Sequence, residues 1–171
     1  MSLSRPRGSR DFLNYRLSRL LNASGAMVVR LCEGRYGITR REWRVIALLA
    51  EEGAMSPSGL AERTHLERGR VSALITQLVA KDLLQRQAVA GDARRAEVSL
   101  SEKGRALYDE LLPQSAAFNR EVLDALSAEE QDAFDAMLQK LTEAAERLAA
   151  TRPVPEKADR RHGGARRLRP R

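Results

Sequence analysis

The sequence predicts a mostly α-helical domain that contains one short β-hairpin. Three observations lead to this fold class. Apolar residues recur every three or four positions over most of the chain, Ser and Thr residues stand where helices should begin, and one central stretch alternates apolar with polar residues instead. A chain of 171 residues is about one domain in length and can bury a core without disulfide or metal support. We assign residues 10–151 to that domain.

The N-terminal helix is predicted to be long. Apolar residues recur at helical spacing over residues 11–33, and Gly34 and Gly37 are expected to end the helix. The stripe includes Leu13, Leu17 and Leu20.

Residues 101–151 are predicted to form two further long helices. Ser101 should cap the first, which is expected to bend near Pro113, and a capping box at Ser127 should open the second. Apolar positions in the last helix alternate three and four apart, as in a heptad seam. They are Phe134, Met137, Leu141, Ala144 and Leu148. We therefore expect the N-terminal and C-terminal helices to pack against a second copy of the chain.

The stretch between these long helices predicts a helix-turn-helix. Thr39 and Glu42 form a capping box, and Ser56 followed by Pro57 opens a short third helix. A fourth helix should run from Glu67 to about residue 82. Its buried face is predicted to be Val71, Leu74, Ile75 and Leu78. Two short helices joined by a tight turn make this motif.

The hairpin follows directly. Residues 84–88 and 96–100 alternate apolar and polar side chains, with a polar tip at residues 91–95 between them. A hairpin placed after a helix-turn-helix is a wing, so residues 39–100 are predicted to form a winged helix-turn-helix lobe.

The charge is unevenly distributed along the chain. The net charge of +7 divides into +4 over residues 1–20, +3 over 21–100, −6 over 101–151 and +6 over 152–171. A polyanion is the expected partner, and its binding surface should lie in the first 100 residues or in the tail. The tail, residues 152–171, has three Pro and two Gly and is predicted to be a basic disordered segment.

Two short strings resemble the MarR family of winged helix-turn-helix transcription regulators. The first is Gly91-Asp92-Ala93-Arg94 followed by Val98-Ser99-Leu100-Ser101-Glu102-Lys103-Gly104, and the second is Leu60-Ala61-Glu62 leading to Val71-Ser72-Ala73-Leu74-Ile75 and Leu78. The resemblance covers roughly residues 10–150. It implies a homodimer that binds double-stranded DNA at a palindromic operator and responds to a small aromatic or anionic effector, most often as a repressor.

Stepping 100° per residue from the buried face gives the opposite face of the fourth helix. The residues expected there or at its edges are Arg68, Gly69, Arg70, Ser72, Ala73, Thr76 and Gln77. Small residues let a helix lie deep in the major groove, and Ser, Thr and Arg can bond to bases or phosphates. Many family members have Arg or Lys where this chain has Ala73 and Gln77, so some phosphate or base contacts are either missing here or supplied by Arg68 and Arg70. A solvated helix face is the alternative interpretation.

The resemblance also assigns roles in the wing. It implies that Arg94 enters the minor groove while Asp92 braces it, and that Arg86 and Arg95 lie close enough to meet phosphates.

Two further residues have open interpretations. Cys32 is either a redox sensor or a small buried hydrophobe, and Trp43 either lines a ligand pocket or belongs to the core.

Enzymatic chemistry has little support in the sequence. The two His are far apart, and neither CxxC, HExxH, GxSxG nor a Gly-rich phosphate loop occurs, so no catalytic residue, metal or cofactor is expected. No apolar run could cross a bilayer and no signal peptide is evident, so a cytoplasmic protein without a membrane partner is expected. The alternative function is a winged-helix protein that mediates protein contacts or binds DNA without sequence preference.

Overall fold

The computed structural model describes residues 3–89, 92–152 and 154. Its elements are η1 (Ser9–Asp11), α1 (Leu13–Arg35), α2 (Arg40–Glu52), α3 (Pro57–Thr64), α4 (Arg68–Ala80), β1 (Leu84–Val89), β2 (Asp92–Leu100), α5 (Glu102–Leu123) and α6 (Ala128–Thr151). This order confirms the predicted mostly α-helical fold with a winged helix-turn-helix. The chain divides into two units, residues 1–124 and 125–171, which are described separately.

The helices begin where side-chain caps predicted that they would. The Thr39 hydroxyl accepts a hydrogen bond from the Glu42 amide at 3.2 Å, and the Glu42 carboxylate accepts one from the Thr39 amide at 2.6 Å. Ser56 caps α3 through the Gly59 amide, with Pro57 in the first turn. Ser101 and Ser127 cap α5 and α6 in the same way. These bonds satisfy amides that a helix start leaves free, and they are readable from sequence because they are local.

One helix boundary differs from the prediction. Helix α1 passes through Gly34 and ends at Arg35, and the chain reverses at Gly37, whose φ of 61° lies in the left-handed region. The prediction that Gly34 ends the helix is therefore wrong. A glycine inside a helix costs only about 1 kcal/mol relative to alanine, and burial of Cys32 two residues earlier stabilises this part of α1. Helix α5 continues past Pro113 to Leu123, which agrees with the prediction of one long helix through this proline.

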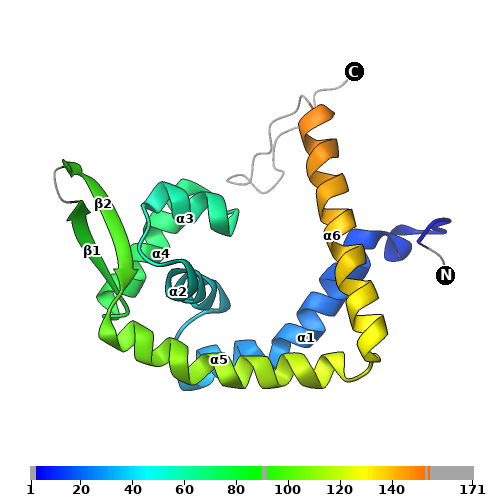
Figure 1. Ribbon diagram of the computed structural model, residues 1–171, viewed down its shortest axis with the longest axis horizontal. Coiled ribbons are helices and arrows are strands. Elements are labelled where there is room, and N and C mark those ends of the chain that lie inside the picture. Colours follow the sequence, from blue (N-terminus) through cyan, green and yellow to red (C-terminus); the bar gives the residue numbers. More distant parts are fainter. Residues whose placement is uncertain (1–2, 90–91, 153, 155–171) are drawn as a thin grey trace, which may run out of the picture. The chain divides into compact units, whose positions relative to one another are not determined.

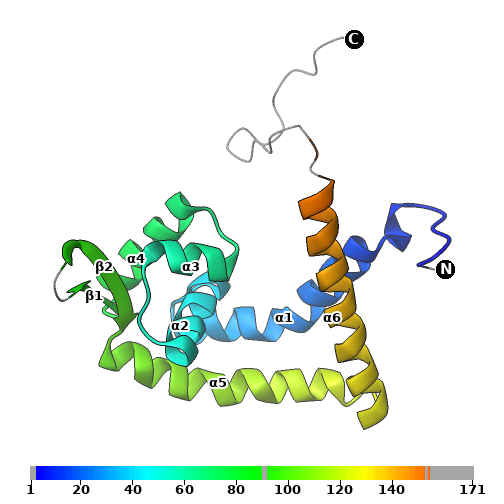
Figure 2. The same ribbon diagram turned by 45° about the horizontal axis from the view of Figure 1, so that its top comes forward.

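The core of residues 1–124 lies among α2, α3, α4, the base of the hairpin and α5. Its fully buried side chains include Ile46, Leu60, Ile75, Leu78 and Leu111. Burying one such side chain stabilises a fold by about 1.5–3 kcal/mol. Figures 1 and 2 both show α1 alongside α5, with α3, α4 and the hairpin at the end where α5 begins. The core therefore fixes the helix-turn-helix onto the first half of α5.

The hairpin is longer than the sequence indicated. The strands pair antiparallel with Leu84 opposite Leu100, and β2 already begins at Asp92. The predicted polar tip at residues 91–95 is therefore wrong for 92–95, which lie in a strand, because backbone pairing does not require apolar side chains. Met55, between α2 and α3, also pairs with Val98 through two backbone hydrogen bonds of 3.1 and 2.9 Å. One edge of β2 is thus tied to the loop that precedes α3.

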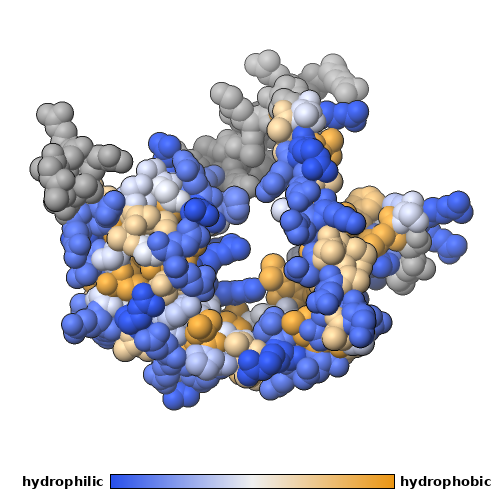
Figure 3. Space-filling model, in the orientation of Figure 1, coloured by the Kyte–Doolittle hydropathy of each residue, from blue (hydrophilic) through white to orange (hydrophobic). Residues whose placement is uncertain are grey.

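Helix α6 forms the second unit among the described residues. None of its side chains is buried; Met137, Leu141 and Leu148 are exposed by 53%, 44% and 55%, and Phe134 is half-buried. Figure 3 shows hydrophobic surface, in orange, along this helix. The heptad spacing is therefore presented on an open helix face.

Candidate nucleic-acid interface

The face of α4 that points away from the core is small, polar and exposed. The exposed residues are those predicted from the helical spacing: Arg68, Gly69, Arg70, Ser72, Ala73, Thr76 and Gln77. The opposite face is buried as predicted, at Val71, Leu74, Ile75 and Leu78. A helix with one fully buried face and one face of small side chains has the shape needed to enter a major groove.

The hairpin joins this face through one side-chain contact. The Arg86 guanidinium donates a hydrogen bond to the Thr76 hydroxyl at 3.2 Å, and Thr76 in turn donates to the Ser72 carbonyl at 3.0 Å. Arg86 is exposed, and the guanidinium has further N–H donors. Sequence reasoning placed both residues in the interface but missed their contact, because residues ten apart on a helix and a strand share no periodicity.

The turn between α3 and α4 is tight. His65 ends α3 with a φ of 54°, in the left-handed region, and the Leu66 amide donates to the Ala61 carbonyl at 3.1 Å. The Thr64 hydroxyl bonds back to the Leu60 carbonyl. This geometry sets the direction of α4 relative to α3.

An ion pair between the half-exposed Lys81 and the buried Glu42 fixes the other end of α4. Lys81 directly follows α4, and its ammonium lies 2.8 Å from the Glu42 carboxylate and 2.9 Å from the Gly37 carbonyl. Glu42 is 1% exposed. Burial alone would raise the pKa of Glu42, but the hydrogen bond and charge of Lys81, together with the Thr39 amide, lower it below its ordinary value. Glu42 therefore both caps α2 and anchors the end of α4.

The first turn of α5 also holds the turn that follows α4. The Lys103 ammonium donates to the Lys81 carbonyl at 3.1 Å, the Ser101 hydroxyl to the Asp82 carbonyl at 2.7 Å, and the Ser101 amide to the Leu83 carbonyl at 3.1 Å. Asp82 has a φ of 59°, in the left-handed region. We call these contacts, between residues 81–83 and 101–104, the α4–α5 clamp.

Three predicted contact residues lie in the hairpin near its tip. The backbones of Asp92, Arg94 and Arg95 belong to β2, and their side chains lie outside the described part of the structure. Apart from residues 152 and 154, the predicted disordered tail also lies outside the described residues.

Trp43 packs between helices α2 and α5. Its ring stacks on that of Tyr108, with centroids 5.7 Å apart and planes at 28°. The Arg105 guanidinium also lies over the Tyr108 ring, 5.5 Å from its centroid. Arg105 also donates to the Ala50 carbonyl at 3.1 Å. These contacts account for Trp43 as a half-buried packing residue.

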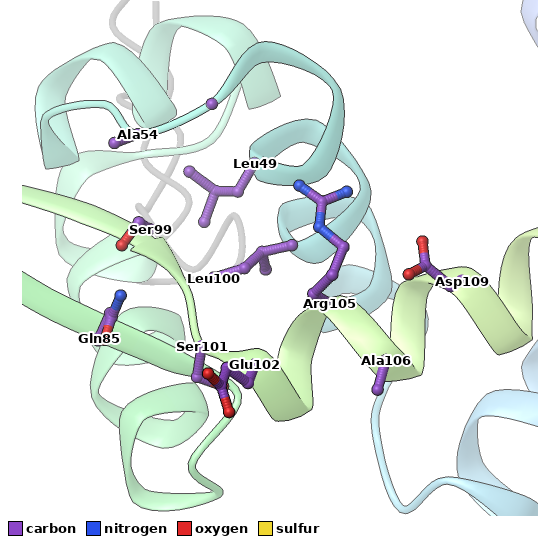
Figure 4. A pocket seen from close by; sticks show the side chains of 11 residues that line it. Leu49, Ala54, Gln85, Ser99, Leu100, Ser101, Glu102, Arg105, Ala106 and Asp109 are labelled. Carbon is purple, nitrogen blue, oxygen red and sulfur yellow. The ribbon is translucent and has the colours of Figure 1, made fainter.

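A hollow of about 750 Å³ lies where α2 ends and α5 begins (Figure 4). Its lining, to which Trp43 does not contribute, consists of Leu49, Gly53, Ala54, Gln85, Ser99, Leu100, Ser101, Glu102, Arg105, Ala106 and Asp109. Figure 4 shows Arg105 extending from α5 toward α2. The buried Ser99 hydroxyl has no hydrogen-bond partner among the described residues. The carboxylates of Glu102 and Asp109 offset the charge of Arg105, so the hollow has no excess of positive charge to select an anion.

Cys32 is completely buried in the core. Burial is the main cause that raises the pKa of its thiol, and the nearby Glu33 charge adds to the rise. A raised pKa lowers the fraction of reactive thiolate. The structure thus has Cys32 as the small buried hydrophobe of the two interpretations.

The described residues contain no cluster of three or more His, Cys, Asp or Glu side chains arranged to hold a metal ion. Within the same part of the chain, each helix is too short or too polar to span a bilayer.

Comparison with known proteins identifies similar regulators. A family model described as "MarR family" matches residues 36–95, which run from the turn before α2 to the hairpin. The chain is 26% identical over 106 residues to the homoprotocatechuate degradative operon repressor of Escherichia coli, covering 62% of this chain and 72% of that protein.

Solved structures show the same relationship. The MarR family transcriptional regulator SPO1453 from Silicibacter pomeroyi is 28% identical with a TM-score of 0.67, covering 78% of this chain and 95% of that one. BpsR of Bordetella bronchiseptica is 23% identical with a TM-score of 0.70, covering 81% and 98%, and shares the fold.

Proposed function

The chain belongs to the MarR family of DNA-binding transcriptional regulators, and we propose that it acts as a homodimer that represses transcription from a palindromic operator until a small ligand releases it. The observation that carries DNA reading is the exposed polar face of α4, joined to the hairpin through Arg86 and Thr76. In this arrangement α4 lies in the major groove, and the hairpin reaches the adjacent backbone and minor groove.

The homodimer is supported by the exposed apolar residues of the long helices. Leu20 and Leu21 of α1 are 47% and 53% exposed, and Met137 and Leu148 of α6 are exposed to a similar degree. Contiguous exposed apolar surface in a soluble fold marks an interaction site. A symmetric dimer presents two copies of α4, so its operator should be a pair of inverted half-sites.

Response to a small ligand is proposed from the relatives. DNA binding by BpsR is regulated by 6-hydroxynicotinic acid, and the E. coli relative is named for an operon that degrades an aromatic acid. We propose a small aromatic effector for this chain. It would act by favouring a dimer in which the two copies of α4 do not match the spacing of the operator half-sites. A thermal-shift screen of hydroxylated aromatic acids, followed by DNA titration with each hit, tests this step.

A DNA competition experiment tests the central proposal. The full chain is first used to select its preferred sequence from random duplexes, and the selected duplex is then titrated against a scrambled duplex of equal length at physiological salt. We expect the selected duplex to bind about a thousandfold or more tightly than the scrambled one. Equal binding to both duplexes would contradict sequence-specific regulation and would favour a protein that coats DNA or contacts other proteins.

A further inference from the structure

The α4–α5 clamp satisfies three consecutive backbone carbonyls from outside their own helix. Within the turn, the Asp82 amide already bonds to the Val79 carbonyl and the Leu83 amide to the Leu78 carbonyl, so the last carbonyls of α4 have partners inside the turn. The carbonyls of Lys81, Asp82 and Leu83 then accept from residues 101 and 103. The end of the reading helix and the start of α5 are therefore joined directly.

Steric contact makes this junction rigid. Gly104 is buried in the first turn of α5, and a Cβ added there would overlap the Leu83 carbonyl oxygen. A side chain at this position would have to move either α5 or the turn. Leu83 and Leu84 are both buried beside the junction, which removes room for such a movement.

From these contacts we infer that Lys103 is a positioning residue for DNA reading: its bond to the Lys81 carbonyl fixes the angle between α4 and α5. The inference rests on the proposed homodimer, in which the long helices set the distance between the two copies of α4. A more variable angle between α4 and α5 would let each copy of α4 change its position, so the dimer would bind half-sites at more than one separation.

The turn at Lys81 also contacts helix α2 and the residues before it. The Lys81 ammonium bonds to Glu42 and Gly37, while its carbonyl accepts from Lys103. One residue thus connects α2, α4 and α5. The Lys103 side chain is exposed, and α5 has its own cap in Ser101, so removal of the Lys103 ammonium leaves the core and the helix start intact.

The test uses Lys103→Met in the full chain, with Lys103→Arg as the conservative variant and Lys140→Met on α6 as the control for loss of one exposed positive charge. Each protein is titrated against the selected operator and against the same operator with its half-sites moved apart by one base pair, at two salt concentrations. The ratio of the two affinities measures how strongly the dimer prefers the original separation of the half-sites.

We expect Lys103→Met to lower that ratio by about threefold or more, in line with the net contribution of one hydrogen bond, with an unchanged salt dependence. Lys103→Arg, which can still donate to the Lys81 carbonyl, and Lys140→Met should keep the wild-type ratio. Gly104→Ala, assayed below its melting temperature, should lower the ratio further because it displaces the turn itself.

Two results would overturn the inference. The first is a wild-type spacing ratio in Lys103→Met, whatever the ratio in Gly104→Ala. The second is an equal loss of affinity for all duplexes with a salt slope shallower by about 0.9 per lost phosphate contact, which would make Lys103 a phosphate ligand. Failure of the proposed function looks different, because the wild-type protein itself would then show no operator preference or no spacing preference.

Discussion

Arg86 lies where the hairpin meets helix α4, and its hydrogen bond to Thr76 holds the guanidinium beside the reading face. A guanidinium held in place can contact phosphate with less loss of side-chain freedom than one on a mobile chain. The residues that would contact DNA are thus partly ordered before DNA arrives.

Arg86→Ala should weaken binding to operator and scrambled duplexes alike, by about tenfold at low salt, and should make the salt dependence shallower by about one phosphate contact per protomer. Lys140→Ala removes a positive charge from α6 and should have a much smaller effect. Fluorescence-anisotropy titrations at several salt concentrations provide the measurement. An unchanged salt slope would show that Arg86 serves only to orient Thr76.

Arg94 tests the wing at the level of a single side chain. Its backbone lies in β2 near the end of the hairpin, beyond the buried Leu84 and Val98 at the hairpin base, so Arg94→Ala should leave the melting temperature and the dimer nearly unchanged. Loss of a guanidinium from a narrow minor groove should cost on the order of 1–3 kcal/mol per protomer and weaken the preference for A·T pairs that flank the half-sites.

Asp92→Ala is the companion variant, and we expect a smaller loss from it because the arginine would remain. Titration against operators with A·T or G·C flanks measures both effects. Operator binding of wild-type strength in an Arg94→Ala protein that melts normally would remove the wing from the mechanism.

At the scale of elements, Glu42 connects helix α2 to the end of α4. The folded state lowers the pKa of Glu42, because Lys81 and the Thr39 amide favour the carboxylate more than burial disfavours it. A carboxyl group with a lowered folded-state pKa stabilises the fold above its unfolded pKa of about 4.3, and this contribution is lost as the pH falls through the folded-state pKa.

Glu42→Gln should therefore destabilise the protein by about 1–3 kcal/mol at pH 7, and the difference from wild type should shrink as the pH falls below about 4. The glutamine can still complete the capping box, so helix α2 should form. Melting temperatures at a series of pH values check this, with Glu62→Gln at an exposed position of α3 as the control. A difference that is constant across the series would show that the ion pair contributes nothing through its charge.

Local chemistry made many elements predictable from the sequence. Thr39, Ser56, Ser101 and Ser127 marked helix starts because their hydroxyls bond to amides three residues away, and the 3.6-residue period identified the buried face of α4. Contacts between distant residues were not predictable in this way.

The Lys81–Glu42 pair and the α4–α5 clamp join residues 18 to 39 positions apart, and their side chains look like ordinary surface residues in the sequence. The extent of α1 past Gly34 and of β2 back to Asp92 was missed for a related reason, since pairing and packing with other elements outweighed local preference.

At the scale of the whole molecule, the exposed apolar residues of α6 make the oligomeric state the property that tests the proposed architecture. Leu141→Asp should raise the dimer dissociation constant by about tenfold or more, because a charge would be placed inside an apolar seam. Gln139→Asp is the matched control, with the same change of charge on the same helix outside the seam. Sedimentation velocity at micromolar concentrations measures both. A wild-type protein that sediments as a monomer would contradict the dimeric arrangement.

Strand β1 is paired on one side by β2 and is otherwise an open edge among the described residues. An open edge offers unpaired backbone groups to any other strand, and proteins limit that hazard with short edges and charged side chains. Here the edge has six residues, and Gln85, Arg86 and Gln87 are all exposed along it. Arg86, which we propose contacts DNA, should therefore also hinder edge-to-edge pairing of two hairpins, and its replacement by a β-branched apolar residue should first cause aggregation in concentrated solution.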